Sequence, residues 1–182
     1  MTTKDGLLLK AAREAVSSAL EKKAYSNPEL EKAFPKKSGV FVQLYMKGEL
    51  RGSVGFPEPV HPIARAVVMA AKAAAFEDPR FTRLKQDELK GVKFEVSILS
   101  TPGEIKAAKS ALIKKVKPGK NGYMIRLGPS EGVLLPGETD GMSPEELLED
   151  LCEKAGLSTE MWKDSNAKVY EFRVETYSEQ FK

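Results

Sequence analysis

The clearest chemical pattern in the sequence is a hexapeptide at residues 50–55, which reads Leu50, Arg51, Gly52, Ser53, Val54 and Gly55. It lies in a stretch with strand character, and glycines weaken a strand unless the main chain must bulge or be approached closely. A guanidinium beside such glycines can bind an anionic group through paired hydrogen bonds. We therefore expect a contact site for a small anionic ligand or a protein partner. A bulged strand with a surface arginine is the alternative interpretation.

Ser53 is the candidate nucleophile of the hexapeptide. A serine hydroxyl attacks only when a base within hydrogen-bond reach takes its proton. His61 is the single histidine of the chain, and Asp78 is a carboxylate that would orient it. His61 also stands among prolines at the start of an expected helix, where it would simply cover the turn. A catalytic triad is therefore the weaker interpretation.

Three further charged residues complete the candidate site. Asp78 and Arg80 flank a proline in a polar loop, and we expect them to brace that loop by an ion pair. Glu95 lies on the polar face of an expected strand, where it would pair with Arg51 or act as a general acid or base. An enzyme that uses Glu95 and Ser53 is the second functional hypothesis.

A basic segment, residues 106–120, lies within a longer stretch, residues 105–130, that contains no acidic residue. Its cations are Lys106, Lys109, Lys114, Lys115, Lys117 and Lys120, and Arg126 follows. Such a cluster can contact phosphates, so a nucleic-acid-associated regulatory protein is the third hypothesis. Within residues 105–130 the first aromatic residue is Tyr123, which lies after the basic segment, so base stacking is not indicated. A solvated basic surface is the alternative.

Composition limits the remaining choices. The 182 residues are 41% hydrophobic and 30% charged with a net charge of +3, which is typical of one folded domain. The single cysteine, Cys152, excludes an intrachain disulfide and fits a reducing cytoplasm. One cysteine and one histidine cannot supply about four structural zinc ligands, and no motif indicates a cofactor. No apolar run approaches the roughly 20 residues of a membrane span, so we expect no membrane segment. Abundant lysine and glutamate suggest a heat-loving source.

Periodicity predicts the same order of elements twice. The first half contains strands at 40–46 and 49–55, a helix from Ile63 onward and a strand at 92–98, all after a helix at about 3–24. The second half contains a hairpin at 122–127 and 132–135, a helix that begins after Ser143 and a last strand at 170–176. We therefore predict an internal duplication of residues 39–100 and 122–177. Alternating strands indicate an α+β fold with antiparallel pairing.

The chain resembles the AMMECR family, named for a human chromosomal region linked to Alport syndrome, midface hypoplasia and elliptocytosis. The resemblance rests on the hexapeptide with the run from Gly39, on residues 74–81, 95–100 and 132–136, and on residues 151–157 with Trp162. These segments span nearly the whole chain in the family's order and at its intervals. The chain is therefore identified as a stand-alone, prokaryotic-type member.

The resemblance implies one domain over residues 1–182, with two related halves around a barrel-like sheet flanked by helices. Family members occur beside or fused to Memo-type domains and near radical S-adenosylmethionine proteins, which implies a functional link to them. The family usually carries cysteine where this chain has Ser53, and the loss of a thiolate favours a binding surface over sulfur chemistry. The expected binding residues are Leu50, Arg51, Gly52, Ser53, Gly55, Asp78, Arg80 and Glu95.

Overall fold

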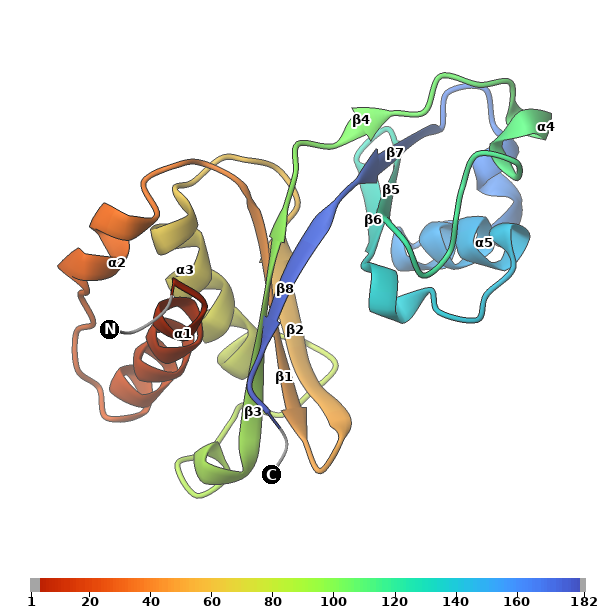
Figure 1. Cartoon of the computed structure of the whole chain (residues 1–182). Helices are drawn as coiled ribbons and strands as arrows, with labels where there is room; N and C mark the ends of the chain where they lie inside the picture. Colours follow the sequence, from red (N-terminus) through yellow and green to blue (C-terminus); the bar gives the residue numbers. More distant parts are fainter. Residues whose placement is uncertain (1–3, 181–182) are drawn as a thin grey trace. The chain divides into compact units, whose positions relative to one another are not determined.

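The computed structural model describes residues 4–180, and its contacts divide the chain into two compact units (Figure 1). The first unit contains the chain up to Leu99 together with the segment from Glu175 onward, and the second unit is Ser100–Val174. Within residues 4–180, no helix is both long enough and apolar enough to cross a membrane. The mixed α and β composition confirms the expected α+β class.

The sheet of the first unit has the strand order β2-β1-β3-β8. Its strands are β1 (Gly39–Met46), β2 (Glu49–Phe56), β3 (Val92–Leu99) and β8 (Val174–Ser178). The central strand β1 pairs antiparallel with β2 on one side and β3 on the other, as the alternation predicted. Val40, Val42 and Leu44 of β1 are fully buried on one face of the sheet, which defines the core side.

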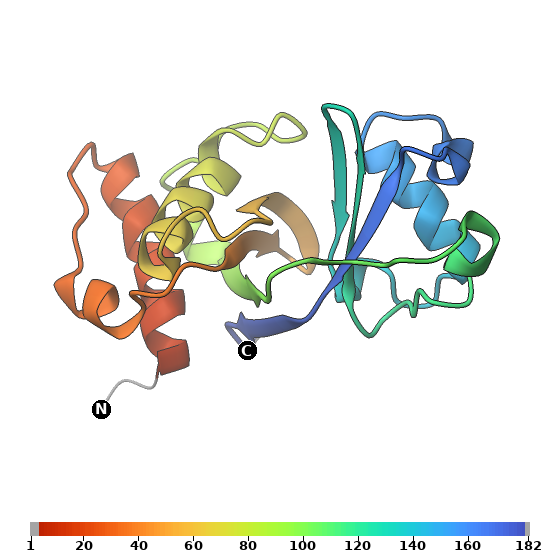
Figure 2. The ribbon, with the colours of Figure 1, turned by 90° about the horizontal axis from the view of Figure 1, so that it is seen from above.

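Helices cover the core side of this sheet. They are α1 (Lys4–Leu20), α2 (Pro28–Ala33) and α3 (Ile63–Phe76), and a short 3-10 helix, Leu89–Gly91, precedes β3. Seen from above, α1 and α3 lie on the same side of the sheet (Figure 2). The predicted helix at 3–24 ends earlier, because Lys22 adopts a φ of 57° that interrupts helical geometry. Residue 3 lies outside the described part of the chain.

The sheet of the second unit has the order β4-β7-β5-β6. Its strands are β4 (Gly103–Glu104), β5 (Gly122–Leu127), β6 (Ser130–Leu134) and β7 (Lys168–Phe172), with helices α4 (Lys109–Leu112) and α5 (Pro144–Lys154). Two 3-10 helices, Pro136–Glu138 and Thr159–Lys163, complete it. The predicted start of α5 is confirmed, because the Ser143 hydroxyl accepts from the Glu146 N–H and the Glu146 carboxylate accepts from the Ser143 N–H.

The predicted last strand at 170–176 is instead two strands in two sheets. β7 ends at Phe172 beside β5, and β8 begins at Val174 beside β3. Between them the main-chain N–H of Arg173 donates to Ser100 Oγ at 3.0 Å. The alternation of apolar and polar residues continues without a break through Arg173, so the pattern gave no sign of the change of sheet.

Both sheets repeat the same local topology. In each, the second strand of a hairpin leads through a helix to a strand on the other side of the first, giving β2-β1-β3 and β6-β5-β7. Among the described residues each sheet is open, because its edge strands do not pair with each other. This matching order supports the predicted duplication, which stays a prediction.

Candidate functional site

The hexapeptide occupies the middle of β2 and contains the expected bulge. Leu44 of β1 lies opposite Gly52, but the next residue, Tyr45, lies opposite Leu50. Arg51 is therefore the extra residue that has no partner in the ladder. A bulge turns the side chain of its extra residue out of the normal alternation, and this reorientation sends the Arg51 side chain toward the loop that follows α3.

Both glycines of the hexapeptide are required by contacts inside the protein. A Cβ on Gly52 would lie 2.1 Å from the carbonyl oxygen of Ala74, in the last turn of α3. A Cβ on Gly55 would lie 2.3 Å from the ring of Phe41 on the neighbouring strand. The close approach that the sequence indicated therefore comes from α3 and from an aromatic ring of the same unit.

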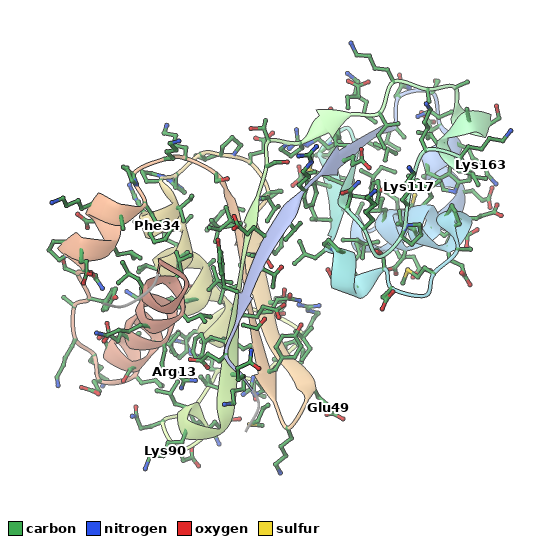
Figure 3. All side chains as sticks on the ribbon, in the orientation of Figure 1. Arg13, Phe34, Glu49, Lys90, Lys117 and Lys163 are labelled. Carbon is green, nitrogen blue, oxygen red and sulfur yellow. The ribbon has the colours of Figure 1, made fainter. Side chains whose placement is uncertain are left out.

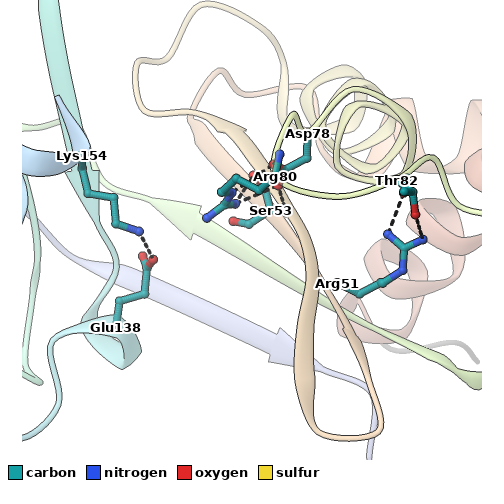
Figure 4. Close-up of polar contacts among 7 residues, drawn as sticks. All are labelled: Arg51, Ser53, Asp78, Arg80, Thr82, Glu138 and Lys154. Atoms are coloured by element: carbon teal, nitrogen blue, oxygen red, sulfur yellow. Dashed lines mark hydrogen bonds and ion pairs between the residues drawn. The ribbon is translucent and has the colours of Figure 1, made fainter. Parts of the chain in front are cut away.

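Arg51 forms an internal ion pair instead of facing solvent. Its guanidinium donates to the Glu88 carboxylate at 3.1–3.2 Å. It also donates to the carbonyl oxygen of Thr82 at 2.8 Å (Figure 4). The Arg51 side chain is only 11% exposed. The expected pairing of Arg51 with Glu95 is wrong. Arg51 pairs with Glu88, because the loop between α3 and β3 places the Glu88 carboxylate beside the guanidinium.

Asp78 and Arg80 brace their loop as predicted, and they also hold Ser53. The Asp78 carboxylate accepts from the Ser53 N–H at 2.8 Å and from the Arg80 guanidinium at 2.8 and 3.0 Å (Figure 4). Arg80 also donates to the Ser53 carbonyl oxygen at 3.3 Å. Burial by itself would raise the pKa of Asp78, but the hydrogen bonds from Arg80 and Ser53 outweigh it and lower that pKa.

The lowered pKa of Asp78 predicts a pH-dependent contribution to stability. A carboxylate whose pKa falls on folding stabilises the protein above its ordinary pKa of about 4, and this contribution is lost as pH falls through the folded value. Asp78→Asn should therefore destabilise the protein at neutral pH, and its deficit should shrink toward pH 2. The measurement is the free energy of unfolding against pH for both proteins. Asp87→Asn, at an exposed position, should show no such convergence.

A polar row crosses the face of the first sheet opposite the core. Ser53, Gln43 and Glu95 lie side by side in register on β2, β1 and β3. Ser178 of β8 donates its hydroxyl to Glu95, and Ser97 shares a 3.1 Å hydrogen bond with Thr176 in the adjacent row. We call Ser53, Gln43 and Glu95 the polar row. It joins two predicted site residues through a residue that the sequence analysis missed.

Gln43 is the unusual member of the polar row. Its side chain is buried, at 5% exposure, yet its amide makes no hydrogen bond to any residue between 4 and 180. Among residues 4–180, Trp162 Nε1 is the one fully buried side-chain polar atom without a hydrogen-bond partner, so the Gln43 amide retains contact with solvent. The available signal in the sequence was a glutamine between Val42 and Leu44 in a central strand. This signal is weak, because a half-covered face of a sheet accepts polar as well as apolar residues.

The catalytic arrangement considered for Ser53 does not form. Both Asp78 oxygens are occupied by Ser53 and Arg80, and His61 packs edge-on against Phe56 with ring centroids 5.7 Å apart. Glu95 is two strands from Ser53, a main-chain separation of about 10 Å. Glu95 instead borders a cavity of about 150 Å³ with Tyr45. The structure therefore brings Ser53 together with Asp78 and Arg80, and leaves Glu95 apart.

The basic segment belongs to the second unit, around α4 and the turn after it. Lys109 donates to the carbonyl oxygen of Ala167, and burial lowers its pKa. The other five lysines are exposed and form no ion pair within residues 4–180, and Figure 3 labels Lys117 among them. These five are Lys106, Lys114, Lys115, Lys117 and Lys120. A role in nucleic-acid binding stays a prediction.

The fold defines an α+β protein with two open, four-stranded antiparallel sheets flanked by helices. The chain belongs to the AMMECR1 family, which matches residues 9–177. It is 41% identical over 177 residues to a protein of Aquifex aeolicus, covering 94% of this chain and 91% of that protein. It is 39% identical over 175 residues to Protein Ta0236 of Thermoplasma acidophilum, covering 94% and 85%.

A solved structure confirms the fold. The crystal structure of PH0010 from Pyrococcus horikoshii superposes with a TM-score of 0.90 at 34% sequence identity, covering 96% of this chain and 91% of that chain. The relatives come from thermophiles, which agrees with the composition rich in lysine and glutamate. Family and fold are thus established.

Proposed function

We propose that the protein binds a small anionic ligand on the polar row, at the end of the row that Ser53 of the hexapeptide forms. The observation that carries the proposal is the amide of Gln43, which belongs to a residue only 5% exposed, retains contact with solvent and lacks a hydrogen-bond partner within residues 4–180. An amide in this position supplies one acceptor and two donors. A bound molecule with matching groups would hydrogen-bond to an amide that the protein itself does not engage.

The anionic group of the ligand is assigned to Arg80 instead of Arg51. Arg51 is held by Glu88, whereas the Arg80 side chain is 47% exposed and lies against the main chain of Ser53. Asp78 holds the Arg80 guanidinium through two hydrogen bonds. A guanidinium restrained in this way loses little freedom when it binds an anion.

Ser53 adds a hydroxyl beside Gln43. Its main-chain groups are bonded to Asp78 and Arg80, while its hydroxyl makes no hydrogen bond to the described part of the chain. Serine serves here as a donor and acceptor, which suits recognition and needs no neighbouring base. This arrangement supports ligand binding over the acid–base chemistry of Glu95 and Ser53, and that enzyme hypothesis stays a prediction.

Titration with inorganic phosphate, followed by two-dimensional ¹⁵N–¹H NMR, tests the proposal. The side-chain NH₂ signals of Gln43 should shift saturably together with the main-chain N–H of residue 53. Arg80→Ala should weaken phosphate binding by about tenfold, since a charge-assisted hydrogen bond is lost. Gln43→Leu should abolish the NH₂ response and change the free energy of unfolding by less than about 0.5 kcal/mol, because the amide that it removes is in contact with solvent.

Gln86→Leu is the matched control, because Gln86 is exposed in the loop before β3. It should leave both phosphate binding and stability unchanged. Gln43 signals that stay fixed at saturating phosphate, or shifts that are identical in Arg80→Ala, would show that no anion binds the polar row. A protein partner that shifts the same signals without phosphate would replace the small ligand as the occupant.

We infer a cytoplasmic location for this activity. The single cysteine is buried and free, as expected for a protein that needs no oxidising compartment. A functional link to Memo-type or radical S-adenosylmethionine proteins stays a prediction from the family.

A further inference from the structure

A second cavity of the first unit lies on the helical side, away from the hexapeptide. It has a volume of about 580 Å³ and is lined by the connection before α2, by α2 and by the beginning of α3. Figure 1 shows α2 beside the start of α3. Sites for small organic molecules typically measure about 300–1,000 Å³. The cavity is therefore large enough for such a molecule.

The wall of this cavity is mainly apolar. Leu30 of α2 is buried, and Val68 and Met69 of α3 are partly buried on the opposite side, with Pro35 between them. Exposed apolar surface of this kind is stabilised when a hydrocarbon or aromatic group covers it. Met69 adapts to ligands of different shape because its side chain is unbranched and flexible.

Hydrogen-bonded side chains fix one rim of the cavity. The Tyr25 hydroxyl accepts from Asn27 Nδ2 at 3.2 Å and donates to the Glu14 carboxylate at 3.3 Å, while Asn27 Oδ1 accepts from the Leu30 N–H. Burial raises the pKa of Tyr25, so its phenol stays protonated and keeps donating to Glu14. A rim held by these bonds keeps the cavity open in the absence of a ligand.

The cationic group of the cavity is Arg65. It lies in the first turn of α3, is exposed, and forms no ion pair or hydrogen bond to residues 4–180. The first two N–H groups of α3 are not available to a ligand, because Ile63 donates to the Lys36 carbonyl oxygen at 2.8 Å and Ala64 donates to the Phe34 carbonyl oxygen at 3.3 Å. Glu31 lines the cavity as well and opposes an anion, and the described residues do not pair with it.

We propose that this cavity binds a small amphipathic anion, such as an alkyl or aryl carboxylate. The apolar body lies against Leu30, Val68 and Met69, and the anionic group lies at the Arg65 guanidinium. The site is separate from the polar row, so it adds a second ligand to the proposed function.

The fluorescent probe 1-anilinonaphthalene-8-sulfonate, an aromatic anion, tests this site. The folded protein should bind one equivalent saturably, with a blue-shifted and stronger emission. Decanoate should displace the probe at a concentration at least about tenfold lower than decanol, because only decanoate carries the charge. Arg65→Gln should weaken probe binding about tenfold, and Glu31→Gln should tighten it about twofold to threefold.

Two controls make these outcomes decisive. Arg173→Gln makes the same change at an exposed arginine of the second unit and should leave the affinity unchanged. Gln43→Leu should also leave it unchanged, which separates this site from the polar row. Equal displacement by decanol and decanoate, or unchanged affinity in Arg65→Gln with native circular dichroism and melting temperature, would overturn the proposal. Val68→Phe, which fills the cavity with an apolar ring, should block the probe in a folded protein.

Discussion

Replacing Gly52 with alanine is expected to lower the free energy of unfolding by about 3 kcal/mol. The new Cβ would lie 2.1 Å from the carbonyl oxygen of Ala74, well inside contact distance. Both sides of this contact are main chain, in a strand and in a helix that pack together, so relief requires moving α3 off the sheet. Denaturant unfolding followed by far-ultraviolet circular dichroism measures the change.

Gly91→Ala is the control for this prediction. Gly91 is exposed before β3, a Cβ there meets nothing within 4 Å, and its φ is not in the left-handed region. Its substitution should change the free energy of unfolding by less than about 0.5 kcal/mol. If both alanine variants were equally stable, the glycines of the hexapeptide would not be explained by packing, and contact with an outside molecule would again be the best account of Gly52.

The second large effect concerns Arg51 and Glu88. Each single alanine variant is expected to lose about 2–3 kcal/mol, since the partner is left charged in a largely buried place, with side chains 11% and 22% exposed. The double variant should lose little more than either single variant. A double-mutant cycle on the free energies of unfolding should therefore give a coupling of about 2 kcal/mol.

Phosphate titration of the same variants separates structure from binding. Arg51→Ala should retain phosphate binding at the polar row as long as the protein is folded, because Arg80 is the assigned anion contact. Arg173→Ala serves as the exposed control and should leave stability unchanged. An Arg51→Ala protein of normal stability that no longer binds phosphate would return Arg51 to the ligand site.

The sequence predicted most of the sheet elements because each strand depends on local alternation. The bulge and the close approach at Gly52 were predicted correctly, because glycine weakens a strand and is expected there only where the main chain bulges or another group packs against it. What approaches Gly52 was not predictable, because Ala74 is an unremarkable small residue on the buried face of a helix. A short alternation of polar and apolar residues shows which face of a strand is buried. It does not identify the helix or strand that packs against that face.

The same distinction applies to the candidate site. The Asp78–Arg80 pair was predicted because its members are two residues apart and meet locally. The pairing of Arg51 with Glu88 depends on the path of the whole loop between α3 and β3, and no local pattern encodes that path. Gln43 was missed because its significance is an absence of partners, which appears only when every neighbouring strand is in place.

The chain leaves its first unit after Leu99 and returns to it at Glu175, and Ser100 and Arg173 are hydrogen-bonded to each other next to these two points. The Ser100 N–H donates to the Arg173 carbonyl oxygen at 2.9 Å, and the Arg173 N–H donates to Ser100 Oγ at 3.0 Å, just before β8 takes its place beside β3. We therefore expect loops within residues 101–172 to tolerate changes in length without a change in the register of β3 and β8. A shift at Ser100 or Arg173, in contrast, would move β8 along the sheet that carries the polar row.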